Sequence, residues 1–119
     1  MATLLVNTGK ANVTSALTSS TSKYIGWGTG AGTTALTDTT LFTETGSRTT
    51  GTQSQQTTTT TNDTYQVTGT TTAGGTLAIT NAGIFDASTS GNLFAKGDFS
   101  TINLSSGDSI AFTFKVQFT

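Results

Sequence analysis

An alternation of apolar and polar residues in the last part of the chain constrains the fold most. From residue 108 to residue 119 every second side chain is apolar: Ile110, Phe112, Phe114, Val116 and Phe118. Successive side chains of a β-strand point to opposite faces, so a strand here has one apolar face and one mostly polar face. The pattern predicts a half-buried strand. Because three of the seven Phe residues lie in it, we expect it to supply much of the core.

Shorter strand patterns recur at roughly ten-residue spacing, bounded by Gly, Asn, Asp or Ser. Their alternation adds four residues to the predicted core, Leu77, Ile79, Ile102 and Leu104. We expect a bulge at Gly83, because the two apolar residues after it break the alternation. Besides the last strand, the expected strands span residues 23–27, 57–61, 64–72, 76–82, 93–96 and 99–104.

One short helix is expected near the start of the chain, at about residues 8–20. Asn7 or Thr8 is a suitable cap for it. One face of this helix carries three apolar residues, Val13, Ala16 and Leu17. Residues 36–44 are expected to form an ordered connection that contacts the core through three side chains, Leu36, Leu41 and Phe42.

The polar segment at residues 48–61 has two interpretations. It is either a flexible low-complexity loop or an exposed strand that another subunit covers. The strand is favoured, because Asn62-Asp63 is a good turn and the alternation resumes after it with Tyr65 and Val67. This arrangement is typical of a β-hairpin.

Short strands with a single early helix predict an all-β protein. The expected architecture is an antiparallel, jelly-roll-like β-sandwich with one short N-terminal helix. The length suits one domain, residues 1–119, with the sandwich at about 23–119. The apolar residues promise only a modest core, whereas ordering such a chain costs on the order of 100 kcal/mol. Partner subunits are therefore expected to supply part of the stability.

Composition excludes several classes of function. The chain has no Cys, His or Pro, so it has no disulfides and no thiolate or imidazole metal site. Its five basic residues are scattered and its formal net charge is −1, unlike the basic patch of a nucleic-acid-binding protein. No stretch approaches the length of a membrane span, and the apolar run 4–6 is too short for a signal peptide. We expect a protein made in the cytoplasm that binds neither nucleic acid nor membranes.

Three patterns resemble ligand sites, and each is better interpreted as a turn. Gly26–Thr34 lacks the Lys-Ser/Thr ending of a phosphate loop. Asp86, Ser88 and Ser90 have the spacing of a calcium loop but supply only one carboxylate. No spacing selects a glycosidase pair among the acidic residues, Asp38, Glu44, Asp63, Asp86, Asp98 and Asp108. We predict no catalytic, cofactor-binding or metal-binding residue, and no enzymatic activity.

The candidate interface residues are Thr and aromatic side chains. Thr57, Thr59 and Thr61 lie on one face of the expected Thr-rich strand, which a neighbouring subunit would cover. Tyr24 and Trp27 are suited to stacking on a sugar, but packing in the core or against a subunit is the favoured interpretation.

Longer motifs carry a family resemblance. They are YIGWGTG (24–30) and TDTTL (37–41), then ITNAGIFDA (79–87), SGNLFAK (90–96) and FSTINLSSGDSIAFTF (99–114). From about residue 7 onward, the chain resembles a family of small tailed-bacteriophage virion proteins. The motifs are structural, comprising a strand with a glycine–hydrophobic–aromatic step, a turn, and a closing strand after Gly-Asp. The Thr-rich segment 49–61 departs from the family pattern.

The resemblance implies a component of the phage particle. Members of the family are head decoration (cement) proteins or parts of tails and fibres, and a chain this short suits a decoration protein best. Such proteins are β-sandwich knobs, often homotrimers, seated where subunits of the major capsid protein meet. The implied location is the head surface of the virion, where the protein would hold the shell against internal DNA pressure. Two alternatives stay open: a tail, neck or fibre-associated subunit, and a module that binds a host surface glycan.

Overall fold

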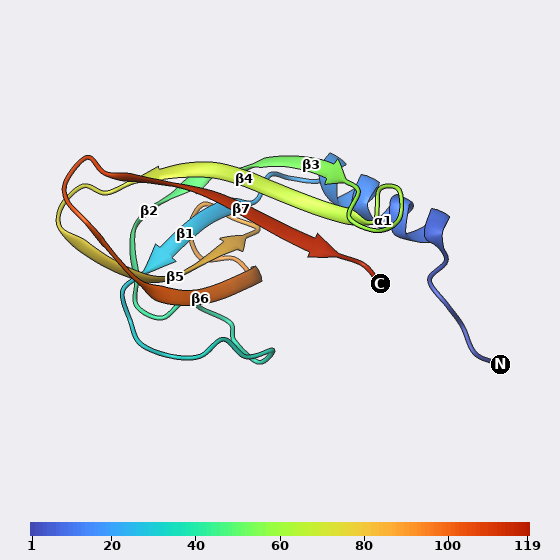
Figure 1. The fold of residues 1–119 in the computed structure, drawn as a ribbon, viewed down its shortest axis with the longest axis horizontal. Coiled ribbons are helices and arrows are strands. Elements are labelled where there is room, and N and C mark those ends of the chain that lie inside the picture. Colours follow the sequence, from blue (N-terminus) through green and yellow to red (C-terminus); the bar gives the residue numbers. More distant parts are fainter.

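The computed structural model describes residues 1–119. The chain forms one helix and seven strands, which are α1 (Asn7–Ser19), β1 (Tyr24–Gly28), β2 (Glu44–Thr50), β3 (Thr52–Gln56), β4 (Thr64–Thr72), β5 (Leu77–Phe85), β6 (Leu93–Leu104) and β7 (Ser109–Gln117). Its principal extents are 52 × 26 × 25 Å. The long axis follows β4 and β7, with α1 at one end (Figure 1).

Two antiparallel sheets make up the body of the molecule (Figure 1). The strands of one sheet follow the order β2-β1-β5-β6, and those of the other follow β3-β4-β7. The chain passes between the sheets after β2, β4 and β6. This arrangement confirms the predicted all-β, sandwich-like fold with one short N-terminal helix. The jelly-roll-like detail stays a prediction, because a jelly roll has eight strands and this chain forms seven.

Gly51 marks the point where the chain leaves one sheet for the other. Its N–H donates to the backbone carbonyl of Lys23 (2.8 Å), and a Cβ at this position would collide with the side chain of Val67. Because Gly51 has no side chain, the backbone here can pass close to Val67 of β4. One residue is then enough to connect β2 with β3. Within the segment 48–61, the strand interpretation is right as far as Gln56.

The rest of that segment is a loop, so the predicted strand at residues 57–61 is wrong. The carboxylate of Asp63 accepts hydrogen bonds from the backbone N–H groups of Thr58 (2.9 Å), Thr59 (3.1 Å) and Thr60 (3.0 Å). Because these three N–H groups donate to the Asp63 side chain, they cannot donate to a neighbouring strand. The hairpin of β3 and β4 exists, but its turn is longer than Asn62-Asp63.

The terminal strand β7 lies where the alternation predicts it. It pairs with β4 from Ser109–Thr72 to Gln117–Thr64. Its apolar side chains are half-buried, because β7 is the outer strand of its sheet and one flank of each side chain has no neighbouring strand. The expectation that this strand supplies much of the core is therefore only partly met.

The centre of the core lies on β1, β4 and β5. One cluster of buried side chains comprises Trp27, Ala73, Ile79, Ala82 and Leu104, and a second comprises Ile25, Tyr65, Val67 and Ile84. Among the predicted core residues, Ile79 and Leu104 are buried. Val116 is half-buried, and those that pack against the clusters while partly exposed are Leu77, Ile110, Phe112, Phe114 and Phe118.

Ile102 is not a core residue, so that prediction is wrong. Its side chain is 40% exposed, whereas its partner across the β5–β6 pair, Ile79, is fully buried. The two residues share a face of the sheet, but β6 is the outer strand. The side chain of Ile102 therefore lies at the rim of the sandwich.

Several element boundaries differ from the expected ones. β6 is one continuous strand where two were expected, and β5 continues to Phe85. The β5–β6 register shifts between Ile79 and Asn81, and again at the end of β5, and not at Gly83. β2 starts at Glu44, the last residue of the expected connection, and continues into the segment 48–61, because it pairs with the buried strand β1.

The connection between β1 and β2 contacts the core through fewer side chains than expected. Leu41 is buried, but Leu36 is fully exposed, so its predicted contact is wrong. The buried side chain of Asn81 holds the connection in place. Its Oδ1 accepts from the backbone N–H of Phe42 (3.0 Å) and its Nδ2 donates to the carbonyl of the same residue (3.1 Å).

α1 is attached to β3 and the following loop by hydrogen bonds. Gln55 Nε2 donates to the carbonyl of Ala11 (3.0 Å) and to Thr14 Oγ1 (2.8 Å). Thr14 is the buried residue of the helix, and its hydroxyl donates to the carbonyl of Asn62 (2.7 Å). Hydrogen bonds therefore attach the helix to the sheet where an apolar face was predicted to do so. Ala16, one of the three residues of that predicted face, is exposed.

The start of α1 also differs from the prediction. Val6 occupies the cap position and makes no side-chain cap hydrogen bond, so the predicted cap by Asn7 or Thr8 is wrong. The helix is not long or apolar enough to cross a membrane.

The contrast between Ile79 and Ile102 predicts a difference in stability. Ile79→Ala is expected to lower the free energy of unfolding by about 2–5 kcal/mol, because it leaves a cavity between the sheets. Ile102→Ala, the matched change on the paired strand, is expected to cost about 1 kcal/mol or less, because Ile102 lies at the rim, is 40% exposed and leaves no enclosed cavity. Urea denaturation of the two variants measures both values, and equal losses would contradict this description of the core.

Candidate functional site

Two long strand edges lie open on the same side of the sandwich. β6 is the outer strand of one sheet and β7 the outer strand of the other. Each pairs with a neighbour on one side only, so the backbone N–H and C=O groups along its free edge have no strand partner. Such edges are templates for pairing with another chain.

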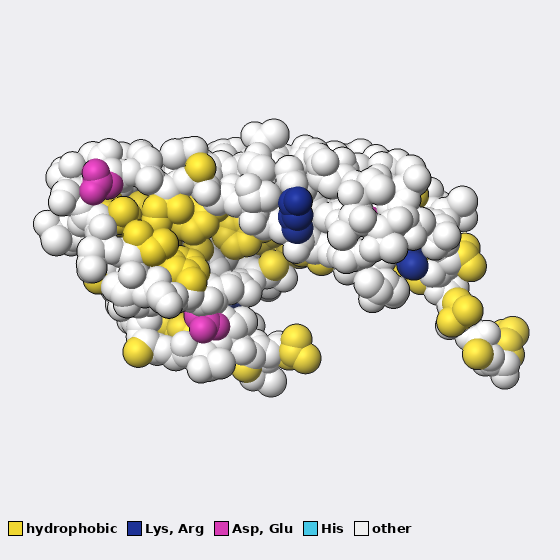
Figure 2. All heavy atoms as spheres, in the orientation of Figure 1, with side chains coloured by type: hydrophobic (Ala, Val, Ile, Leu, Met, Phe, Trp, Pro, Cys, Tyr) yellow, Lys and Arg dark blue, Asp and Glu magenta, His cyan; other side chains and the backbone are white.

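An apolar groove of about 320 Å³ lies between these two strands. Its apolar lining comprises Ala82 and Ala95, Phe99, Phe112, Phe114 and Val116. Figure 2 shows hydrophobic side chains gathered in a recess on this face, where β6 and β7 run in Figure 1. We call this feature the β6–β7 groove.

Aromatic rings form the floor of the β6–β7 groove. The Phe112 ring meets Trp27 edge-on at a centroid distance of 6.3 Å and stacks on Phe114 at 5.8 Å. Phe99 lies on the opposite strand, 6.5 Å from the Phe112 centroid. Gly97 leaves the β6 side open, because a Cβ there would have no atom within 4 Å. Apolar surface therefore reaches solvent where a closed sandwich would bury it.

Two basic residues line the groove: Lys115 is exposed, and Lys96 is already paired. Its Nζ donates to Asp38 Oδ2 (2.8 Å) and to the carbonyl of Thr40 (3.0 Å), and it lies over the Phe42 ring. The hydrogen bond from Lys96 holds the pKa of Asp38 below its ordinary value. This ion pair ties the connection between β1 and β2 to β6 and leaves the groove predominantly apolar.

The segment Met1–Val6, which we call the arm, is the second exposed apolar feature. It precedes α1 and projects from the end of the molecule (Figures 1 and 2). Met1 is 117% exposed and Leu4 80% exposed, and Leu5 and Val6 are also exposed. The only backbone group of the arm in a hydrogen bond is the carbonyl of Val6, which accepts from the N–H of Lys10.

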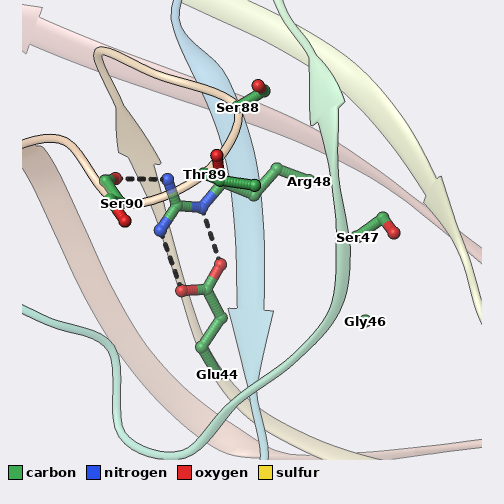
Figure 3. A pocket seen from close by; sticks show the side chains of 7 residues that line it. All are labelled: Glu44, Gly46, Ser47, Arg48, Ser88, Thr89 and Ser90. Atoms are coloured by element: carbon green, nitrogen blue, oxygen red, sulfur yellow. Dashed lines mark hydrogen bonds and ion pairs between the residues drawn. The ribbon is translucent and has the colours of Figure 1, made fainter.

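A polar recess lies on another part of the surface, around Arg48 (Figure 3). Arg48 Nε and Nη2 donate to the two carboxylate oxygens of Glu44 at 2.7 and 3.0 Å. Nη1 donates to the carbonyls of Ala87 (2.8 Å) and Ser90 (2.7 Å), and the guanidinium lies 3.5 Å from the centroid of the Phe85 ring. The side chain is 8% exposed. Because most of its donors are used within the chain, Arg48 acts as a clamp between β2 and the turn after β5.

The pattern at Asp86 is a turn as predicted, whereas Gly26–Thr34 begins inside β1 and only its later residues belong to the connection after that strand. Asp86 Oδ1 accepts from the backbone N–H of Asn92 (2.7 Å) and Oδ2 from its side-chain amide (3.0 Å), which lowers the pKa of Asp86. The N–H groups of Thr29 and Gly30 donate to carbonyls of the strand entry at residues 42–43. No three acidic side chains come together as a metal-binding group.

The predicted interface residues separate into two groups. Thr57, Thr59 and Thr61 are exposed, in the loop between β3 and β4. Tyr24 is half-buried. Trp27 is 2% exposed and packs against Phe112, so its interpretation as an interface or sugar-stacking residue is wrong. Sequence reasoning assigned Trp27 by its residue type, which does not distinguish a core position from an exposed one.

Sequence reasoning missed the β6–β7 groove and the arm. Phe99 was placed in a strand without a role, and the apolar run at Leu4, Leu5 and Val6 was considered only as part of a signal peptide. The arm had a local signal in that run. The groove had none, because it depends on which strands end up at the edges of the two sheets.

The Asp63 carboxylate predicts a pH dependence of stability. Hydrogen bonds from the backbone N–H groups of Thr60, Thr58 and Thr59 and from the Thr64 hydroxyl hold its pKa well below the ordinary value. A lowered pKa contributes stability that is present above the unfolded-state pKa and is lost as the pH falls through the folded-state pKa. Asp63→Asn removes this contribution, because an amide has only one accepting oxygen.

We therefore expect Asp63→Asn to be less stable than wild type at pH 7, with the difference shrinking between about pH 5 and pH 2. Urea denaturation at a series of pH values measures this difference. A difference that stays constant over the whole range would contradict the role given to the carboxylate.

Comparison of the chain with protein-family models, with curated proteins and with solved structures finds no match.

Proposed function

We propose that this protein is a structural assembly subunit, in the most specific form a capsid decoration protein of a tailed bacteriophage. The observation that carries the proposal is the β6–β7 groove, an apolar surface between two unpaired strand edges. The resemblance to small virion proteins supplies the kind of assembly. The major capsid protein would be the partner, and the head surface of the virion the location.

The surface area of the chain supports an assembly role. It exposes 6681 Å², whereas a compact monomer of 12.1 kDa exposes about 6,000 Å². Its radius of gyration is 15.4 Å, against about 13.5 Å for a compact domain of this length. Only 21 of 119 residues are buried. An elongated chain with an open groove gains stability when a partner covers it.

The mechanism of a decoration protein is mechanical. Apolar and strand-edge surface buried across the joints between capsid subunits stabilises the shell, and each buried Å² of apolar area contributes roughly 25 cal/mol. A homotrimer places the same surface at each of three neighbouring joints. The exposed threonines of the loop after β3, Thr57, Thr59 and Thr61, are the proposed contacts on the polar side.

Two other functions are kept as alternatives. The same groove suits a tail, neck or fibre-associated subunit, since it specifies an apolar partner and not its place in the particle. A host-glycan-binding module would use the polar recess, whose lining includes Ser47, Ser88, Thr89 and Ser90. The clamp role of Arg48 disfavours the second alternative, because the best donor of that recess is already engaged.

Copy number tests the proposal. In purified particles of the phage that encodes this chain, quantitative mass spectrometry is expected to find copies comparable in number to the major capsid protein. A decoration protein follows the head lattice, whereas tail and fibre components follow a single axis with few copies. A low copy number would move the protein to the tail, and its absence from particles would overturn the proposal. Binding of host polysaccharide by wild type, abolished by Arg48→Met, would favour the glycan module.

A further inference from the structure

We propose that the arm of one copy, Met1–Val6, lies in the β6–β7 groove of a second copy and pairs with the free edge of β7. This inference rests on the proposed role as an assembly subunit and names the contact between copies. An extended segment that adds a strand to an exposed sheet edge is a common mode of recognition. Here the added segment and the edge belong to the same chain type.

The residue pattern of the arm suits the groove. In an extended segment Ala2, Leu4 and Val6 share one face. The lining of the groove is apolar in the same way, with Phe112, Phe114 and Val116 on β7 and Ala95 and Phe99 on β6. Neither surface has a partner within the chain: Leu4 is 80% exposed, and β7 has a free edge.

The charges also fit. The interior of the groove carries no acidic side chain among its lining residues, and its Lys96 is paired with Asp38. The arm has no charged side chain. A strand without charged side chains therefore brings no carboxylate into the groove; the other basic lining residue, Lys115, is exposed, and its long side chain can keep its ammonium group in water.

The excess surface of the chain matches one side of a protein interface. The 6681 Å² exposed by the molecule exceeds the area of a compact monomer by roughly 650 Å². A standard interface buries about 800 Å² on each partner. The arm and the groove both expose apolar side chains, so each copy offers both halves of one contact.

The arm points away from the groove of its own copy, at the end of the long axis (Figure 1). A contact between copies is therefore favoured over folding back. Arm-to-groove contacts in which each copy gives to the next are heterologous, and they form a ring when the rotation between successive copies closes. Three copies in such a ring make the homotrimer proposed above.

Aspartate substitutions in the arm test the contact. Wild type at about 100 μM, a concentration above the micromolar dissociation constants of weak standard interfaces, is expected to be oligomeric by light scattering. The double variant Ala2→Asp/Leu4→Asp is expected to self-associate at least about a hundredfold more weakly, because it places carboxylates against the Phe floor. Leu36→Asp is the matched control, since Leu36 is also fully exposed but lies far along the chain in the connection before β2.

Three results would overturn the inference: a monomeric wild type, an arm variant that stays oligomeric, or a Leu36→Asp variant that dissociates to the same extent. Circular dichroism and urea denaturation confirm that each variant is folded. The arm lies outside the body, so its substitutions are expected to leave the unfolding midpoint of the monomer unchanged.

Engineered thiols give a second readout, because the chain has no cysteine. Leu4→Cys and Ala95→Cys are made as separate proteins, mixed and mildly oxidised. The expected product is a disulfide-linked pair with one arm thiol and one groove thiol, identified by mass spectrometry. Absence of this mixed pair would overturn the inference. So would an intrachain disulfide in the Leu4→Cys/Ala95→Cys double variant, which would show that the arm occupies its own groove.

These results are distinct from the copy-number measurement. A chain that oligomerises through its arm but is absent from phage particles keeps the arm contact and loses the decoration role. A chain that is abundant on heads but monomeric in solution, with no mixed disulfide, keeps the role and loses the arm contact.

Discussion

The unequal closure of the two sheets is the constraint on which the rest of the structure depends. The sheets share the continuous segment at Gly51 on the β2–β3 side, whereas β6 and β7 end the two sheets as unpaired strands on the other side. Side chains near β1, β4 and β5 are therefore enclosed, and those on β6 and β7 are covered on one flank only. This difference explains why the Phe side chains of β7 are half-buried, why Ile102 is exposed and why the groove is open.

Polar side chains hold the loops and the helix that the small apolar clusters do not reach. Asn81 binds the connection before β2 and Gln55 binds the helix. Asp63 accepts hydrogen bonds from the loop between β3 and β4, and Arg48 connects β2 to the turn after β5. Each of these side chains bonds to backbone groups that have no place in a strand ladder. Since leaving a buried donor or acceptor unpaired costs about 1–3 kcal/mol, these contacts fix the loops of a Thr-rich chain that has few apolar residues to pin them.

The proposed assembly role rests on the same shortage of buried apolar side chains. The sandwich is open on the side of β6 and β7, so apolar surface stays exposed in the β6–β7 groove. A partner that covers the groove removes apolar surface of both molecules from water. In the proposed contact between copies, the arm would supply a partner surface of the same chemistry, and the free edge of β7 would supply the backbone hydrogen bonds.

Local pattern was enough to determine much of this protein. The alternation at residues 110–118 specifies β7, and the apolar pairs at Leu77 and Ile79 specify the phase of β5. Turn residues place most of the connections, and composition alone excludes Cys and His chemistry. These features depend on the two-residue period of a strand and on side chains close in sequence, so they can be recognised without knowing the partners.

Only the tertiary structure decided which strands lie at the edges. Ile79 and Ile102 have the same side chain and the same phase, yet one is buried and the other is at the rim. By its residue type Trp27 suited either the core or an interface, and the fold encloses it. Thr57–Thr61 was predicted as a strand and is a loop held by Asp63. Burial and strand order depend on contacts between residues far apart in the chain, and a one-dimensional pattern carries no record of which neighbour will be present. The groove, which is the structural observation behind the proposed function, therefore had to come from the fold.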